Sequence, residues 1–70
     1  MSEGMVTVSV NGVPKSVAAA TVADLVAALG LAGKRIAVER NGEIVPRSRY
    51  AQTRIANDDR LEIVGAVGGG

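Results

Sequence analysis

Two Asn-Gly dipeptides, each lying between two short strand-like runs, constrain the fold of this 70-residue chain more than any other feature. Asparagine and glycine both accept the positive φ angles that a tight hairpin turn requires. Residues Met5 to Val10 alternate between apolar and polar side chains, which is the period of a half-buried strand. Asn11-Gly12 follows, then Pro14, whose missing N–H is tolerated at a turn or a sheet edge. Because Lys15 to Ala18 is suited to return along the first strand, a β-hairpin is predicted.

The second dipeptide, Asn41-Gly42, predicts another hairpin. Before it, Arg35 to Arg40 carries apolar side chains two residues apart, as expected for a strand with one buried face. After it, Glu43 to Val45 forms the returning strand, and Pro46 ends that strand because proline cannot donate to a sheet ladder. The two hairpins together supply most of a small sheet.

Between the hairpins, the apolar period changes from that of a strand to that of a helix. Thr21 is the expected N-cap, and Asp24 three residues later forms a variant of the capping box that also suits the helix dipole. Gly30 is expected to end the helix in the left-handed conformation. The apolar stripe of the helix consists of Val22, Leu25, Val26 and Leu29.

The rest of the chain is predicted to complete one sheet. Ser48 to Thr53 lacks strand alternation and is expected to form a helical turn or loop with Tyr50 folded inward. Asn57-Asp58-Asp59 predicts a polar turn, and Arg60 to Val64 predicts the final strand. One amphipathic helix must cover the apolar face of a sheet, so we expect an α+β fold with a mixed sheet of about four to five strands on one main helix. The expected core consists of Val6, Val8, Val10, Leu25, Leu29, Ile36, Val38, Leu61 and Ile63.

Composition excludes several classes of function. The chain has no cysteine and no histidine, so it lacks thiolate metal ligands, a cysteine nucleophile and the commonest general base. We therefore expect no catalytic residue and no metal site, since Asp58 and Asp59 alone make a weak pair of ligands. A net charge of +1 and a single aromatic residue argue against nucleic-acid binding. No apolar stretch has the length of a transmembrane helix and no signal peptide is visible, so we expect no membrane partner and a cytoplasmic location.

The sequence given ends in Ala66-Val67-Gly68-Gly69-Gly70. Glycine loses more conformational freedom on ordering than any other residue, so this segment adds little to folding. Without Cβ atoms, however, it can enter a narrow channel and bring its carboxylate to a reactive group of another protein. A frayed end without function is the alternative. We expect a disordered extension at 1–4, a folded domain at 5–65 and a flexible tail at 66–70.

A resemblance to a known family lies in the run AVERNGEIVPRSRYAQTRI (Ala37 to Ile55) and the following DDRLEIVGAVGGG. The chain resembles the sulfur carriers of thiamine thiazole biosynthesis, which belong to the ubiquitin-like β-grasp proteins. The matching features are the Asn-Gly hairpin, Val45-Pro46-Arg47, an aromatic residue three positions later, an acidic turn, the final strand and the glycine end. Two features depart from the family: Asn57-Asp58-Asp59 replaces a common Gly-Asp step, and a third terminal glycine is present.

The resemblance implies chemistry at Gly70. In this family, a ubiquitin-activating-like adenylyltransferase uses ATP and Mg²⁺ to convert the C-terminal glycine to an acyl adenylate. Sulfur that originates from a cysteine desulfurase then replaces AMP, and thiazole synthase takes the sulfur from the resulting thiocarboxylate. The resemblance thus implies a carrier protein and not an enzyme, with no cofactor bound by the chain itself. Val67, Gly68 and Gly69 would be recognised by the partners.

Partner binding is expected to depend on the folded domain, because ordering each tail residue costs about 1–2 kcal/mol. The expected interface consists of Val64, Ala66, Arg47, Arg49 and Arg60. Three other functions stay open. They are the small subunit of molybdopterin synthase, which typically has a proline-containing end, a ubiquitin-like modifier joined to lysines, and a protein-binding domain whose tail has no role.

Overall fold

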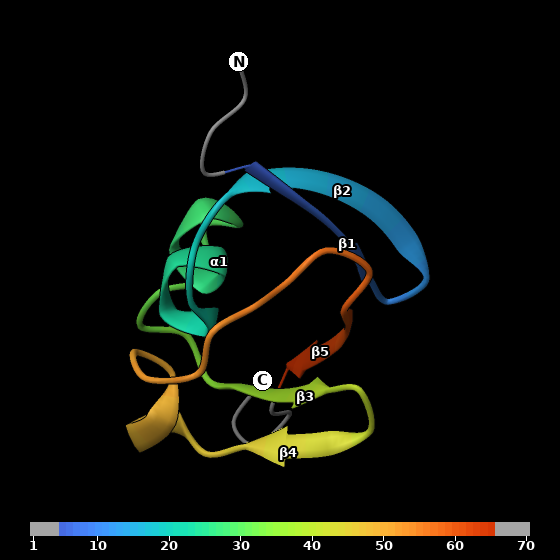
Figure 1. The fold of residues 1–70 in the computed structure, drawn as a ribbon. Coiled ribbons are helices and arrows are strands. Elements are labelled where there is room, and N and C mark those ends of the chain that lie inside the picture. Colours follow the sequence, from blue (N-terminus) through green and yellow to red (C-terminus); the bar gives the residue numbers. More distant parts are fainter. Residues whose placement is uncertain (1–4, 66–70) are drawn as a thin grey trace.

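Five strands form one mixed sheet in residues 5–65, the part of the chain that the computed structural model describes (Figure 1). The elements are β1 (Met5–Val10), β2 (Val13–Ala18), α1 (Val22–Ala28), β3 (Ile36–Arg40), β4 (Glu43–Val45), the 3₁₀-helix η1 (Arg47–Arg49) and β5 (Arg60–Gly65). The strands lie in the order β2-β1-β5-β3-β4. β1 and β5 are parallel, and the other neighbouring pairs are antiparallel. The predicted order of elements is confirmed, whereas the extension at 1–4 and the tail at 66–70 lie outside the described residues.

Both Asn-Gly dipeptides form the predicted turns. The φ angles are 52° at Asn11 and 84° at Gly12, and the second turn repeats them with 53° at Asn41 and 88° at Gly42. β2 begins at Val13, two residues earlier than expected, and therefore includes Pro14. Proline is tolerated there because β2 is an edge strand of the sheet.

The helix begins and ends where the sequence predicts. The Thr21 hydroxyl accepts a hydrogen bond from the backbone N–H of Asp24 at 3.2 Å, and the Asp24 carboxylate accepts one from the N–H of Thr21 at 3.2 Å. These two bonds confirm the capping box. Gly30 has a φ of 75°, which is the left-handed conformation expected just after the helix.

The core lies between α1 and one face of the sheet (Figure 1). Six of the nine predicted core residues are buried, and the other three, Val6, Leu29 and Ile36, are partly buried against the core. The structure adds residues that strand and helix periods did not place there: Val17, Ala19, Val45 and Ile55. Ile55 was missed because it lies in a loop without a repeating pattern, where its N–H donates to the carbonyl oxygen of Ala20 at 3.0 Å.

The predicted turn at residues 57–59 is confirmed, but one of its carboxylates is buried. Asp59 is 7% exposed and accepts hydrogen bonds from Arg40 Nε at 2.7 Å, Asn41 Nδ2 at 3.1 Å and the N–H of Ala56 at 2.8 Å. Asp59 therefore ties the turn to the second hairpin. Within residues 5–65, no helix has the length and apolarity to cross a membrane.

Candidate functional site

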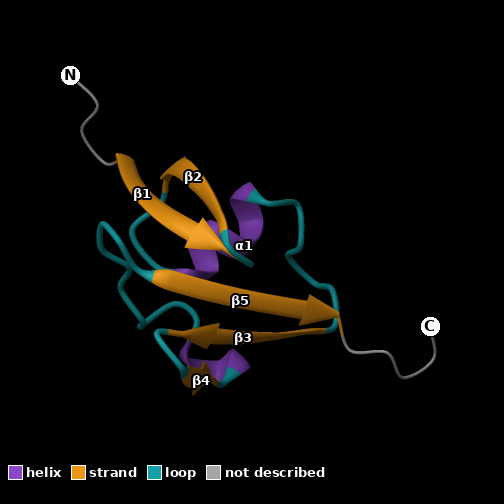
Figure 2. Cartoon of the chain, turned by 90° about the vertical axis from the view of Figure 1, so that its right-hand side faces the viewer, coloured by secondary structure: helices purple, strands orange, loops and turns teal. Residues whose placement is uncertain are grey.

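β5 leads directly to the C-terminal segment, so its surroundings define the candidate site. Figure 2 shows β5 between β1 and β3 near the middle of the sheet. The side chains of β5 alternate: Leu61 and Ile63 are buried in the core, whereas Glu62 and Val64 are exposed on the opposite face. We call this opposite side of the sheet the open face. The last residue of β5, Gly65, is paired with Ile36 of β3.

The open face carries exposed apolar side chains next to acidic ones. Val64 is 61% exposed and lies opposite Ala37 of β3, while Ile44 of β4 is 71% exposed. Glu39 lies opposite both Glu62 and Ile44, which places these three side chains in one row across the strands. Val64 and Ile44 are thus apolar residues on a surface that no described element covers.

The arginines of the expected interface fall on two sides of the sheet. Arg60 lies four residues before Val64 on β5, so both side chains are on the open face. With Glu39 and Glu62, Arg60 borders an open hollow of about 390 Å³. Arg47 borders a groove of about 150 Å³ together with α1 and Tyr50. The structure therefore places Arg60 and Val64 on the same open face, at the start and near the end of β5, and places Arg47 on the helix-covered side.

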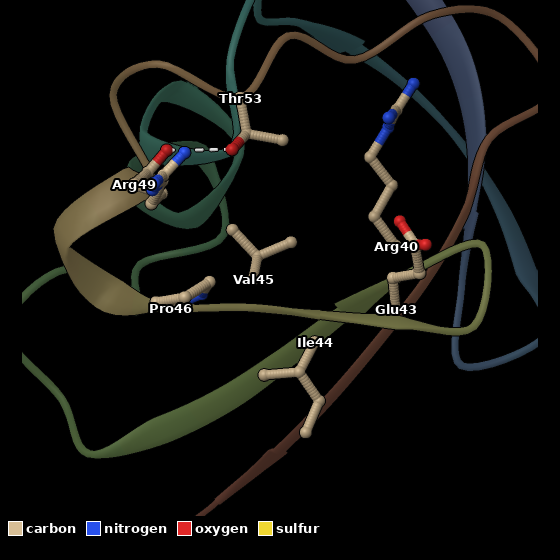
Figure 3. A pocket seen from close by; sticks show the side chains of 7 residues that line it. All are labelled: Arg40, Glu43, Ile44, Val45, Pro46, Arg49 and Thr53. Atoms are coloured by element: carbon tan, nitrogen blue, oxygen red, sulfur yellow. Dashed lines mark hydrogen bonds between the residues drawn. The ribbon is translucent and has the colours of Figure 1, made fainter.

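Arg49 also lies away from the open face. It borders a groove of about 310 Å³, which residues of β4 and Thr53 also line. The Thr53 hydroxyl donates to the carbonyl oxygen of Arg49 at 2.8 Å. Figure 3 shows Val45 pointing into this groove and Ile44 pointing away from it. Among the expected interface residues, Ala66 lies outside the described residues, as do the tail residues Val67, Gly68, Gly69 and Gly70.

Hydrogen bonds hold the charged carboxylate of Asp59, the residue directly before β5. Burial works to raise the pKa of the Asp59 carboxyl, but the hydrogen bonds from Arg40, Asn41 and Ala56 and the charge of Arg40 outweigh it. The pKa of Asp59 is therefore lowered from its ordinary value. A carboxylate that is paired and hydrogen-bonded in this way is structural, and no three potential metal ligands meet within residues 5–65.

Two asparagine side chains that the sequence assigned only to turns also bind β5. Asn11 Oδ1 accepts from the N–H of Ile63 at 2.8 Å, and Asn11 Nδ2 donates to the carbonyl oxygen of Ile63 at 2.9 Å. Asn41 Oδ1 accepts from the N–H of Arg60 at 2.9 Å. Sequence reasoning missed these contacts because a positive φ angle alone explains asparagine at both turns.

These features define a class of protein. The strand order, the single main helix and a central last strand that leads to the C-terminal segment are those of a β-grasp, ubiquitin-like domain. A solved structure of the same class is similar over almost the whole chain. It is the thiamine biosynthesis protein ThiS from Geobacter metallireducens, with a TM-score of 0.77 and 34% identity, covering 91% of this chain and 99% of that one.

Sequence comparisons identify the family within that class. The ThiS family model matches residues 8–70. The sulfur carrier protein ThiS of Bacillus subtilis is 44% identical over 50 residues, which are 71% of this chain and 76% of that protein. The thiazole synthase of Paramagnetospirillum magneticum is 47% identical over 62 residues, or 87% of this chain, and the chain spans only 19% of that protein's length. This chain belongs to the ThiS family, which confirms the resemblance seen in the sequence.

Proposed function

We propose that this chain is a sulfur carrier of thiamine biosynthesis that acts through the carboxyl group of Gly70. The family match carries the proposal, because it continues through the glycine segment to residue 70. The relative from Bacillus subtilis is named a sulfur carrier protein. The absence of histidine and cysteine from the sequence suits a chain that other enzymes modify. We accordingly assign it no catalytic residue and keep a cytoplasmic location as part of the proposal.

The proposed chemistry consists of two substitutions at the end of the tail. The Gly70 carboxylate, ionised at neutral pH like any α-carboxyl group, attacks the α-phosphorus of ATP on a partner adenylyltransferase. Pyrophosphate leaves with Mg²⁺, and an acyl adenylate forms. Hydrosulfide, released when a thiol reductant supplies two electrons to the persulfide that a cysteine desulfurase forms, then attacks the acyl carbon. AMP leaves, a thiocarboxylate remains, and no electron is exchanged in either step.

Thiazole synthase is the proposed acceptor of this sulfur. Two relatives named thiazole synthase contain a segment similar to this chain, which makes up 19% of one and 20% of the other. A carrier segment and a synthase in one chain meet at a high effective concentration. This arrangement in the relatives supports a partnership between this chain and a separate or linked thiazole synthase.

Docking is proposed to use the open face and the tail together. Val64 offers an exposed apolar side chain near the end of β5 and Arg60 a cation at its start, and Ala66 is proposed to extend this contact. Val67, Gly68 and Gly69 are proposed to enter a narrow channel of the partner, because the glycines have no Cβ to obstruct it. Arg47 and Arg49 remain proposed contacts, but a partner must reach around the edge strand β4 to bind them.

Intact-protein mass spectrometry tests the proposal. The chain is incubated with ATP, Mg²⁺, sulfide and the adenylyltransferase of a thiamine pathway. The expected result is a mass increase equal to one sulfur-for-oxygen exchange, which disappears when ATP is omitted. A chain lacking Gly69 and Gly70 is the matched control, because the deletion leaves residues 5–65 unchanged.

Two outcomes would count against the proposal. One is a full-length chain that gains neither adenylate nor sulfur. The other is a truncated chain that still supports thiamine-free growth in a carrier-deficient host. Discrete conjugates of higher mass in cells, linked through lysines, would instead indicate a ubiquitin-like modifier.

A further inference from the structure

The parallel pairing between β1 and β5 is short. Only Ser9 with Arg60 and Val10 with Leu61 are in register, because β1 ends at the first hairpin turn. On its other side, β5 is paired with β3 as far as Gly65. The last part of β5 would therefore have an unpaired backbone edge toward β1 unless another group satisfied it.

The hydrogen bonds between the two strands follow a regular series. The N–H of Ser9 donates to the carbonyl oxygen of Asp59 at 3.0 Å, and the N–H of Asn11 donates to that of Leu61 at 2.9 Å. The next acceptor in this series is the carbonyl oxygen of Ile63. The next donor would be the backbone of residue 13, but the chain has already turned there into β2.

The side-chain amide of Asn11 takes the missing place in the series. Its Nδ2 donates to the carbonyl oxygen of Ile63 at 2.9 Å, and its Oδ1 accepts from the N–H of Ile63 at 2.8 Å. Because a primary amide has the same donor and acceptor groups as a peptide unit, this contact extends the parallel ladder by one residue. Both bonds are partly buried, so water competes with them less than at an open edge.

We infer that Asn11 is a positioning residue for the C-terminal segment, because its amide holds the β1-facing edge of β5 at Ile63, two residues before that strand ends, while β3 holds the opposite edge. The inference rests on the proposed function. A partner that binds the tail in a channel needs the strand before it to leave the sheet in one direction. Since ordering the tail is already costly, a loose end of β5 would weaken productive binding further.

The second Asn-Gly turn provides a matched control. Asn41 has nearly the same φ angle as Asn11, is also followed by glycine, and also binds β5 through its side chain. Its side chain binds Arg60 at the start of the strand and Asp59 just before it, however, and not Ile63 near the end of the strand. Asn11→Gly and Asn41→Gly each keep a residue that accepts a positive φ angle while removing the side-chain bonds.

The test compares these two variants with the unaltered chain by amide hydrogen exchange and by adenylation kinetics. Asn11→Gly is expected to speed exchange at Ile63, Val64 and Gly65 by about tenfold, given the loss of two hydrogen bonds. It is also expected to lower kcat/KM for adenylation mainly through a higher KM. Asn41→Gly is expected to leave exchange at these three amides and the kinetic constants close to their original values.

Asn11→Asp provides a second variant if the glycine variant folds poorly. Aspartate tolerates the same backbone conformation and keeps an acceptor for the N–H of Ile63, but it loses the donor to the carbonyl oxygen. We expect its exchange rates and KM to lie between those of the unaltered chain and Asn11→Gly.

The inference is overturned if the Asn11 and Asn41 variants match in exchange at residues 63–65 and in KM. An unaltered chain that is never adenylated would instead refute the proposed function. In that case the exchange data still decide whether Asn11 holds the end of β5.

Discussion

The two faces of the sheet use the same strands for opposite purposes. On the helix-covered face, Val8, Val38 and Leu61 are at most 2% exposed and pack with α1. On the open face, Val64 and Ile44 are more than half exposed, although they are as apolar as their buried neighbours. Because side chains alternate along a strand, β5 contributes side chains to both faces. The difference indicates that apolar residues on the covered face stabilise the fold, whereas those on the open face are available to a partner.

The largest expected effect is on the covered face. Leu61→Ala removes a fully buried side chain of β5, so we expect the free energy of unfolding to fall by about 2–5 kcal/mol. Val64→Ala, three residues later on the same strand, is expected to change it by less than about 0.5 kcal/mol. Urea unfolding followed by circular dichroism measures both. Equal losses of unfolding free energy in the two variants would show that the two faces do not differ in their contribution to stability.

A smaller effect is expected at Asp59, which ties the start of β5 to the second hairpin. Asp59→Asn removes the charge that faces Arg40 and leaves at least one of three donors poorly paired, so we expect a loss of about 1–3 kcal/mol. Ser9→Ala on the open face is the control and is expected to have little effect. If Asp59→Asn unfolds at the same urea concentration as the unaltered chain, the network does not contribute to stability.

The same carboxyl gives a pH dependence. The pKa of Asp59 is lower in the folded chain than its ordinary value, so its stabilising contribution is complete above the unfolded pKa of about 3.9. It is lost as the pH falls from there through the lower folded value. We therefore expect part of the acid loss of stability to disappear in Asp59→Asn. Identical acid unfolding curves for the two chains would assign that loss to other carboxyl groups.

On the open face, the expected effect is on binding and not on folding. Val64→Asp is predicted to weaken binding to the adenylyltransferase by about tenfold, because it places a charge in an apolar contact. Val13→Asp is the matched control: Val13 is 54% exposed but lies on β2, at the opposite end of the sheet from β4. Titration calorimetry measures both affinities. Unchanged affinity of Val64→Asp would remove the open face from the interface.

The smallest expected effects are at the arginines of η1. Arg47→Ala and Arg49→Ala are predicted to reduce the same affinity less than Arg60→Ala does, because only Arg60 shares the open face with Val64. Titration calorimetry measures these affinities as well and so compares the open face with the surface around η1. A larger loss for either η1 variant than for Arg60→Ala would show that the partner binds around the β4 edge.

The sequence by itself determined the elements of this protein and much of its core. Alternation placed the strands, the Asn-Gly dipeptides placed both hairpin turns, and Thr21 with Asp24 placed the start of α1, since each signal depends on neighbouring residues. The glycine segment and the motifs around Val45-Pro46-Arg47 identified the family, which the family match confirmed.

Only the tertiary structure decided which distant groups meet. It placed β5 between β1 and β3, divided Arg60 from Arg47 and Arg49, buried Asp59 against Arg40, and brought the Asn11 amide to Ile63. These contacts join residues that are far apart in the chain, so no local period or turn preference encodes them. They form because the sheet order brings each of these polar groups next to partners that satisfy its hydrogen bonds.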